Sequence, residues 1–289
     1  MLRRAGAWRG LLVLNYHRIG EPGSSVLDRD LFSATADEFE RQVAHFATAC
    51  DVIALDEVPA ALRARRGRRV LITFDDGYRD NFDLAFPILR AAGVPVAFFL
   101  ATGFLDRPRL SWWDELAWMG AGREAVERYK RLAADEGEAF LDAAAHRSGR
   151  GRAGPREAEG VWMTWEMARE MRDAGMAFGG HTVHHPVLAG LPAERQRHEI
   201  GGSAQRLADE LGVTMRAFSY PVGSPDAFDE TTMRLVREAG CDIAFAFAGG
   251  RARPGATDPL AIPRMTVVTR LSTDEVRAAT TLPQLFARW

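Results

Sequence analysis

Two adjacent carboxylates follow a short apolar stretch in the first third of the chain. The residues from Val70 to Thr73 are apolar and partly β-branched, which is typical of a buried strand, and Asp75, Asp76 and Gly77 come directly after Phe74. Successive strand side chains point in opposite directions, so one carboxylate can bind a metal ion while the other stays free as a base. Hydrolysis by an activated water needs this division of roles, although an isolated Asp-Asp-Gly is more often only a turn.

Three of the seven histidines fall within five positions, at His181, His184 and His185. His181 and His185 are four residues apart, the spacing that brings two imidazoles to one face of a helical turn, and Pro186 would end that turn. A hydrolytic zinc site usually takes three protein ligands and leaves one position for water. Asp76, His181 and His185 would supply such a set and leave Asp75 as the base, although a lone histidine pair at this spacing is more often an ordinary surface or core pair.

Together the two motifs resemble those of a known family. Thr-Phe-Asp-Asp-Gly at residues 73–77, followed about a hundred residues later by His-Thr-x-x-His at residues 181–185, is similar to the pattern of the polysaccharide deacetylases, carbohydrate esterases of family 4 type built on the NodB homology domain. The resemblance spans roughly residues 11–268. It implies a deformed (β/α) barrel that uses a divalent metal ion, typically Zn²⁺, to remove acetyl groups from N-acetylated sugars. Matched by position, it implies Asp75 as general base and Asp76, His181 and His185 as metal ligands.

The oxyanion motif of the family is altered in this chain. Where the family has Arg-x-Pro-Tyr, residues 219–222 are Ser-Tyr-Pro-Val. The backbone N–H of Val222 can still stabilise an oxyanion, whatever its side chain, but Ser219 cannot orient the base as the family's arginine does. Tyr220 would either line the cleft or pack in the core. We interpret the altered motif as the mark of a subgroup.

The general acid of the family has no direct counterpart either. The family's Leu-x-x-His is missing, because no histidine follows His198. Arg264 lies near that position; its pKa above 12 makes it a poor proton donor, but it can stabilise negative charge on the substrate. His17, expected at the tip of a strand on the same face, is the candidate acid. Equally, His17 would only support another residue of the site. Without other evidence, a histidine at such a position is read as an ordinary core residue.

Strands and helices alternate along most of the chain, which favours parallel strands and an α/β barrel. We expect strands at 11–16, 52–55, 70–73, 94–100, 176–178, 216–220 and 243–247, closure of the barrel by 260–265, and helices after a capping box at 35–38 and at 81–92, 164–174 and 192–211. The arginine-rich run at 63–69 is expected to be a solvated turn.

The alternation lapses between about residues 104 and 160, where we expect a helical insertion that ends in a mobile loop at 146–152. Insertions after the C-terminal end of a barrel strand lie over the active site, so this one would shape the sugar cleft. Trp112 and Trp113 would either stack on sugar rings or anchor the insertion to the barrel.

Composition narrows the class of protein. A chain of 289 residues with 47% hydrophobic residues can bury a large core, and no Ser- or Pro-rich linker divides it, so we expect one domain over residues 1–289 with the insertion at about 104–160. A net charge of −2 does not indicate a nucleic-acid partner. Cys50 and Cys241 lack metal-site spacing and are expected to be buried free thiols, as in a reducing compartment.

The N-terminal segment carries arginines, as signal peptides carry basic residues, but the apolar run behind it covers only Leu11 to Leu14. Such a run is too short for a signal peptide or membrane anchor, and no later stretch approaches a membrane span. We therefore expect a cytoplasmic protein without a transmembrane segment.

The sequence thus predicts a metal-dependent N-deacetylase acting on an N-acetylated amino sugar or polysaccharide. An alternative is hydrolysis of a small, non-polymeric amide or imide by the same site. A catalytically silent glycan-binding relative is a further alternative, favoured by the two altered motifs and opposed by the complete set of metal-binding residues.

Overall fold

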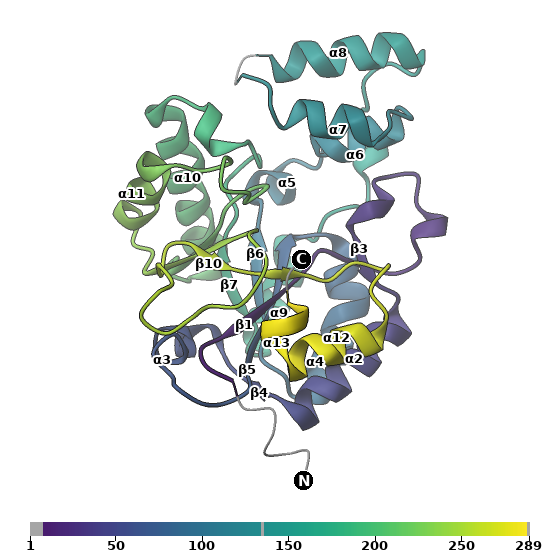
Figure 1. Cartoon of the computed structure of the whole chain (residues 1–289). Coiled ribbons are helices and arrows are strands. Elements are labelled where there is room, and N and C mark those ends of the chain that lie inside the picture. Colours follow the sequence, from purple (N-terminus) through teal and green to yellow (C-terminus); the bar gives the residue numbers. More distant parts are fainter. Residues whose placement is uncertain (1–7, 134–135, 288–289) are drawn as a thin grey trace.

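The computed structural model in Figure 1 describes residues 8–133 and 136–287 and shows a barrel of parallel strands surrounded by helices. Each neighbouring pair along the barrel is parallel, as the alternation of strand and helix predicts. Two-residue β4 (Asp51–Val52) pairs with β5 outside this path. The order of the strands around the barrel is β10 (Ile262–Pro263), β9 (Ile243–Ala246), β8 (Ala217–Ser219), β7 (Ala177–Gly180), β6 (Ala97–Leu100), β5 (Arg69–Asp76), β1 (Leu12–Tyr16) and β11 (Met265–Thr266).

The two edge strands of the sheet nearly meet, and a single residue joins them. Strands β10 and β11 lie at the two ends of the sheet, yet only Arg264 separates them in the sequence. On one side β10 pairs with β9, and the Arg264 N–H donates to the carbonyl of Ala246 at 3.2 Å; on the other side β11 pairs with β1. The predicted deformed (β/α) barrel, closed by the segment 260–265, is confirmed.

Strand β5 is the longest strand of the barrel and delivers the two carboxylates. Every residue of β5 after Arg69 is buried, and the strand pairs with β1 on one side and β6 on the other. Strand β7, which ends just before His181, lies beyond β6. Because neighbouring strands are about 4.8 Å apart, the ends of β5 and β7 are separated by roughly 10 Å, a gap that side chains can bridge.

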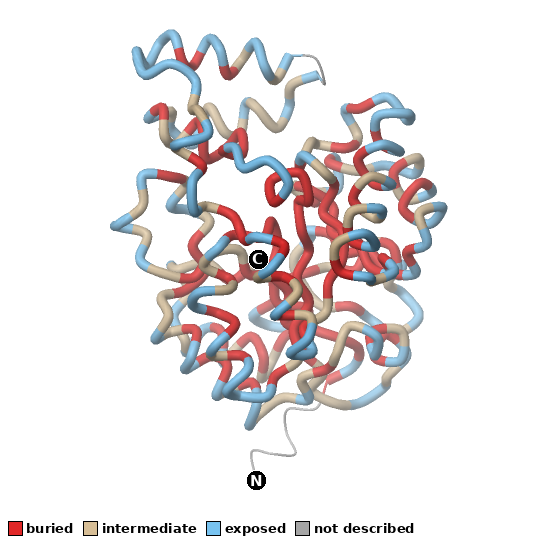
Figure 2. The backbone as a smooth tube through the Cα atoms, turned by 180° about the vertical axis from the view of Figure 1, so that it is seen from behind, coloured by how far each residue is buried: buried red, intermediate tan, exposed pale blue. Residues whose placement is uncertain are grey.

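Amphipathic helices cover the outside of the barrel. Figure 2 shows the buried residues concentrated on the strands and on the inner faces of these helices. The expected capping box forms at the start of α2, where Thr35 and Glu38 cap each other. The helix expected at 81–92 begins as one turn of π-helix, Asn81–Ala85, before α4. The helices are α2 (Ala36–Ala49), α3 (Val58–Ala61), α4 (Phe86–Ala92), α9 (Trp165–Asp173), α10 (Ala193–Leu211), α11 (Glu230–Glu238), α12 (Thr273–Thr281) and α13 (Pro283–Phe286).

The predicted insertion is helical and lies beyond the C-terminal ends of the strands, at the top of Figure 1. Of the expected loop at 146–152, residues 146–148 end α8, and the residues after it contact the rest of the insertion. There Arg152 forms a bidentate ion pair with the buried Glu115, at 2.7 and 3.0 Å, and reaches two further carboxylates on α8. The helices are α5 (Thr102–Asp106), α6 (Trp112–Trp118), α7 (Arg123–Tyr129) and α8 (Gly137–Ser148).

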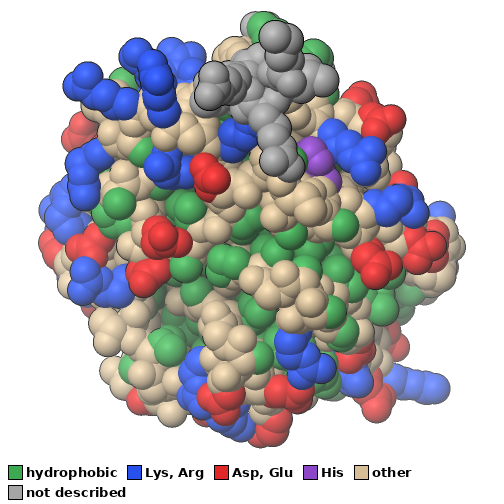
Figure 3. Space-filling view, turned by 90° about the horizontal axis from the view of Figure 1, so that it is seen from below, with side chains coloured by type: hydrophobic (Ala, Val, Ile, Leu, Met, Phe, Trp, Pro, Cys, Tyr) green, Lys and Arg blue, Asp and Glu red, His purple; other side chains and the backbone are tan. Residues whose placement is uncertain are grey.

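The opposite end of the barrel carries the arginine-rich run, since Arg69 begins β5. Figure 3 views the molecule from this side and shows basic and acidic side chains interspersed around apolar ones. Residues 1–7 of the N-terminal segment lie outside the described residues. Within residues 8–133 and 136–287, none of the helices has the length and apolar character needed to cross a bilayer. Both cysteines are free thiols, Cys241 buried and Cys50 half-buried.

Candidate active site

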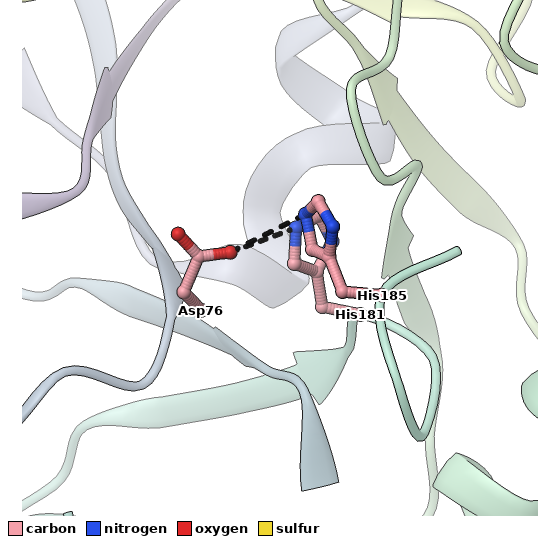
Figure 4. Close-up of side chains that lie close together, drawn as sticks. All are labelled: Asp76, His181 and His185. Atoms are coloured by element: carbon pink, nitrogen blue, oxygen red, sulfur yellow. Dashed lines mark ion pairs between the residues drawn. The ribbon is translucent and has the colours of Figure 1, made fainter. Parts of the chain in front are cut away.

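One carboxylate and two imidazoles converge at the tips of β5 and β7 (Figure 4). The Oδ1 atom of Asp76 lies 3.3 Å from Nε2 of His181 and 3.4 Å from Nε2 of His185. One nitrogen or oxygen atom from each of these three side chains lies within 4.8 Å of the others, and all three residues are buried. The structure thus brings together the three residues that the sequence suggested as metal ligands.

The chemistry of these three atoms fits a cation. His181 Nδ1 lies 2.7 Å from the carbonyl oxygen of Ser219, which only accepts hydrogen bonds, so Nδ1 carries a proton and Nε2, directed at Asp76, is the nitrogen whose lone pair a cation would use. Asp76 Oδ1 is itself buried and has no hydrogen-bond donor among the described residues. Three electron-pair donors therefore face one another, the arrangement that a metal ion such as Zn²⁺ requires.

The pKa shifts of the two histidines also favour a bound cation. Burial and the neighbouring His181 lower the pKa of His185 to about 3, so this imidazole is neutral near pH 7 and available as a ligand. Burial opposes a charge on His181, but Asp75 and Asp76 outweigh it and raise the pKa of His181. The space between these groups therefore attracts positive charge, which a divalent cation supplies.

The two histidines do not lie on a helical turn, and this part of the sequence interpretation was wrong. Residues 181–187 form a loop in which Thr182 and His185 have φ values of 68° and 56°. A left-handed residue cannot continue a right-handed helix, so the chain turns back on itself instead. The turn is closed by the N–H of His185, which donates to Oγ1 of Thr182 at 2.9 Å.

Glu199, on helix α10, braces this loop and was missed in the sequence. Its Oε2 accepts hydrogen bonds from the backbone N–H groups of Val183 and His184 at 2.9 and 2.8 Å, and Oε1 lies 2.9 Å from Nδ1 of His184. The only sequence signal was an acidic residue next to Ile200, on the side of the helix that faces the barrel. The Gly103 N–H also donates to the Val183 carbonyl at 2.8 Å, which fixes the loop from the insertion side.

Asp75 forms an ion pair with Arg264, and its Oδ2 also lies 4.0 Å from Nε2 of His181. Two guanidinium nitrogens lie 2.8 and 2.7 Å from its two carboxylate oxygens, and both residues are fully buried. The Ser219 hydroxyl donates to Asp75 at 3.1 Å and accepts from Arg264 at 2.8 Å. Arg264 therefore orients the carboxylate of Asp75, and because it also lines the pocket, its expected action on the substrate or oxyanion stays a prediction.

The ion pair keeps Asp75 ionised. Burial alone would raise the pKa of Asp75, but the charges of Arg264 and His181 and the hydrogen bonds from Arg264 outweigh burial and hold this pKa well below its usual value. Asp75 is therefore a carboxylate at neutral pH, able to accept a proton.

The remaining candidates line a pocket of about 160 Å³, whose lining also includes Asp76, His181 and His185. His17 follows β1 and is half-buried, with its carbonyl held by Asn81 at 2.7 Å. Val222 also lines the pocket, with φ at 62°, and no acceptor for its N–H occurs among the described residues. Tyr220 reaches the pocket only with its ring: its hydroxyl donates to the Leu260 carbonyl at 2.9 Å and its ring stacks on a neighbouring phenylalanine.

Trp112 and Trp113 of the insertion are largely buried, although both contribute to the lining of the pocket. Trp112 is 8% exposed and stacks on Tyr129 at 4.3 Å, while Trp113 is 4% exposed and packs its ring against His185 at 4.4 Å. The structure therefore favours the anchoring role of this pair over the stacking role.

Backbone strain is concentrated at this pocket. Among residues 8–133 and 136–287, the non-glycine residues with positive φ are Asp76, Thr182, His185 and Val222. Each left-handed residue of this kind costs about 1–3 kcal/mol, so the surrounding contacts must enforce it. Such strain is typical of functional sites, and here it coincides with the carboxylate, the histidine loop and the turn after β8.

Comparison with known proteins identifies the family. The sequence profile described as Polysaccharide deacetylase matches residues 63–244, more than half of the chain. The chain belongs to the polysaccharide deacetylase family. The deacetylase YxkH of Bacillus subtilis (strain 168), assigned to the same family, is 23% identical over 183 residues, which are 63% of this chain and 46% of YxkH. The match thus spans about half the length of that relative.

Two solved structures show the same fold. The deacetylase PplD of Streptococcus pyogenes, determined in complex with acetate, superposes with a TM-score of 0.68 at 19% identity and covers 94% of this chain and 97% of its own. IcaB from Ammonifex degensii gives a TM-score of 0.64 at 24% identity and covers 96% and 97%. Both therefore share the deformed barrel and extend over nearly the whole polysaccharide deacetylase described here.

Proposed function

We propose that this polysaccharide deacetylase is a metal-dependent hydrolase that removes N-acetyl groups from an amino sugar within a carbohydrate. The observation that carries the proposal is the convergence of Asp76, His181 and His185 beside an ionised Asp75 at the floor of one pocket. The acetate in the PplD structure supports an acyl-transfer reaction for the fold.

A divalent ion, which we expect to be Zn²⁺, would be held by Asp76 Oδ1 and by Nε2 of His181 and His185. Bound there, it would supply Lewis acidity toward the amide carbonyl and the attacking water. Asp75 would accept the proton of that water, because Arg264 keeps it ionised and fixes its orientation.

Two further groups of the pocket lining would complete the reaction. The N–H of Val222, which has no acceptor among the described residues, would donate to the oxyanion of the tetrahedral intermediate. His17 would protonate the departing amine, since it is the pocket histidine that the metal set leaves free. Acetate and a free amino sugar would leave.

The altered motifs do not favour a silent glycan-binding relative once the structure is known. The altered motif at residues 219–222 has Ser219 where the family has an arginine. Arg264 takes the place of that arginine, because its guanidinium binds the carboxylate of Asp75. One pocket thus holds a candidate base, the arginine that orients it, a set of three metal ligands and a backbone N–H donor. The general acid is the one role without a direct counterpart of the family motif.

The test is acetate release from N-acetylhexosamine oligomers and from small N-acetyl amides, with and without chelator. We expect chelator-sensitive release from the sugar substrates, full loss in Asp75→Asn with metal content retained, and loss of the metal itself in His181→Ala. Undiminished turnover by Asp75→Asn, or by the metal-free protein, would refute the roles assigned. Release from the small amides alone would instead support the non-polymeric alternative.

A further inference from the structure

The two imidazoles of the candidate metal site are held in different ways. His181 has its Nδ1 fixed by the Ser219 carbonyl at 2.7 Å. His185 Nδ1 is buried and has no hydrogen-bond partner among the described residues. A metal-binding histidine is normally oriented by a hydrogen bond from its second nitrogen, so something else must fix the ring of His185.

The ring of Trp113 packs against the ring of His185. Its centroid lies 4.4 Å from the centroid of the His185 ring, with an angle of 62° between the planes, an edge-to-face contact. Trp113 lies on α6 of the insertion and is buried to 4% exposure. A side chain from the insertion thus limits the rotation of one of the proposed metal ligands.

A directional hydrogen-bond chain fixes Trp113 in turn. The indole N–H can only donate, and it donates to the Tyr78 hydroxyl oxygen at 2.8 Å. The Tyr78 hydroxyl then has one proton to give, and it donates this proton to Oδ2 of Asp114 at 2.6 Å. Every member of the chain is buried, so breaking one link leaves a polar group unpaired inside the protein.

Both ends of this chain are anchored on other elements. Asp114 accepts hydrogen bonds from the Ser111 hydroxyl and from the backbone N–H of Asp28, each at 3.0 Å. Tyr78 is separated from the two carboxylates of β5 only by Gly77, and its ring contacts Trp162, at 4.5 Å, and the Arg18 guanidinium, at 4.6 Å. The chain therefore connects the insertion, the tip of β5 and the loop before β3 (Phe32–Ala34).

We propose that Trp113 is a positioning residue for His185, held in place by Tyr78 and Asp114, and that the insertion thereby forms part of the metal site. This inference rests on the proposed metal-dependent function. In the absence of the Trp113 contact, the His185 ring would sample orientations in which its Nε2 no longer points to Asp76, and affinity for the metal would fall.

Trp112 provides a matched control. It is the neighbouring residue on α6 and is nearly as buried; its ring stacks on Tyr129 at 4.3 Å and packs edge to face against Trp113 at 5.1 Å, and among the described residues no ring contact joins it to His185. Loss of either indole should disturb the packing of the insertion to a similar degree. Only loss of Trp113 should change the metal site.

The experiment measures Zn²⁺ affinity of the chelator-treated full chain by competition with a chromophoric chelator, and the melting temperature of the metal-free protein. We expect W113L to raise the Kd for Zn²⁺ by about 10- to 100-fold, the usual effect of losing a partner that orients a ligand. W112L should lower the melting temperature comparably and leave the Kd close to that of the wild type. W113F, which keeps an aromatic edge against His185, should recover most of the affinity.

The variant Y78F removes the hydroxyl that joins Trp113 to Asp114, with a smaller change of volume. It replaces W113L as the test if W113L does not fold. We expect Y78F to weaken Zn²⁺ binding and to alter the visible absorption spectrum of the Co²⁺-substituted protein, which reports ligand geometry. Wild-type Zn²⁺ affinity in W113L, or in Y78F where W113L is unfolded, would overturn the inference while leaving the proposed function intact. Failure of the wild type to bind Zn²⁺ would overturn the proposed function and the inference with it.

Discussion

Replacing Arg264 with methionine should destabilise the protein and stop catalysis. Methionine is also long and unbranched, so the change removes the charge and the hydrogen bonds with a modest change of volume. The guanidinium makes two short hydrogen bonds to Asp75 and others to Ser219 and Asn15, and it is 1% exposed. R264M therefore leaves a fully buried carboxylate without its counter-charge.

The size of the effect follows from that burial. Removing one partner of a buried ion pair typically costs about 3–5 kcal/mol, because the remaining charge stays desolvated. In the wild type the pKa of Asp75 is held below its usual value, so the pair stabilises the fold above about pH 4 and this contribution is lost on acidification. In R264M burial dominates and raises the pKa of Asp75, so that protonation on acidification should partly relieve the destabilisation.

A double-mutant cycle on the metal-free protein tests this reasoning by urea denaturation at pH 5 and pH 8. We expect R264M to be the least stable variant, with the larger loss of stability at pH 8. The double variant D75N/R264M should regain much of the lost free energy of unfolding, because neither member of the buried pair then carries a charge. R264M with wild-type stability, or a double variant no more stable than R264M, would show that Arg264 does not compensate Asp75.

Three further outcomes follow from the same geometry. Val222→Gly keeps the backbone N–H and removes the cost of a left-handed valine, so acetate release should be retained; loss of release would assign the role to the side chain. Glu199→Gln cannot accept from both the loop N–H groups and His184, so metal content after gel filtration should fall and the free energy of unfolding should decrease by about 1–3 kcal/mol. Burial raises the pKa of Asp114 from 3.8 to about 6. The folded state thus holds this proton more tightly, stability should decline as pH rises from about 4 to 6, and Asp114→Asn should flatten that decline; equal slopes in denaturation series would contradict it.

The barrel was predictable because its signals are local. Each strand around the site is a short apolar run, and each covering helix has an apolar face, so the order of elements and the positions of Asp75 and Asp76 follow from residues within a few positions of one another. The capping box at Thr35 is of the same kind. Where the period of the sequence matches the period of the structure, the sequence predicts the element.

The histidine loop shows where this method stops. A spacing of four residues matches one helical turn, yet His181 and His185 meet through a loop with two left-handed residues. That conformation depends on Glu199 and Gly103, which come from α10 and α5. Spacing predicted that the two side chains would meet, but the backbone path depended on distant partners that carry no local signal.

Arg264 shows how closure of the barrel brings distant residues to one site. In the strand order, β7 and His181 lie two strands from β5 on one side, across β6, while Arg264 follows β10 and precedes β11, two strands from β5 on the other side, across β1. At about 4.8 Å per strand, both are within reach of the β5 tip. Asp76 contacts both histidines and Asp75 pairs with the arginine, and the left-handed backbone of Asp76, with φ at 74°, ends the regular alternation of the strand between them. A residue at the seam can therefore replace an arginine missing from β8, although 45 positions separate it from Ser219 in the sequence.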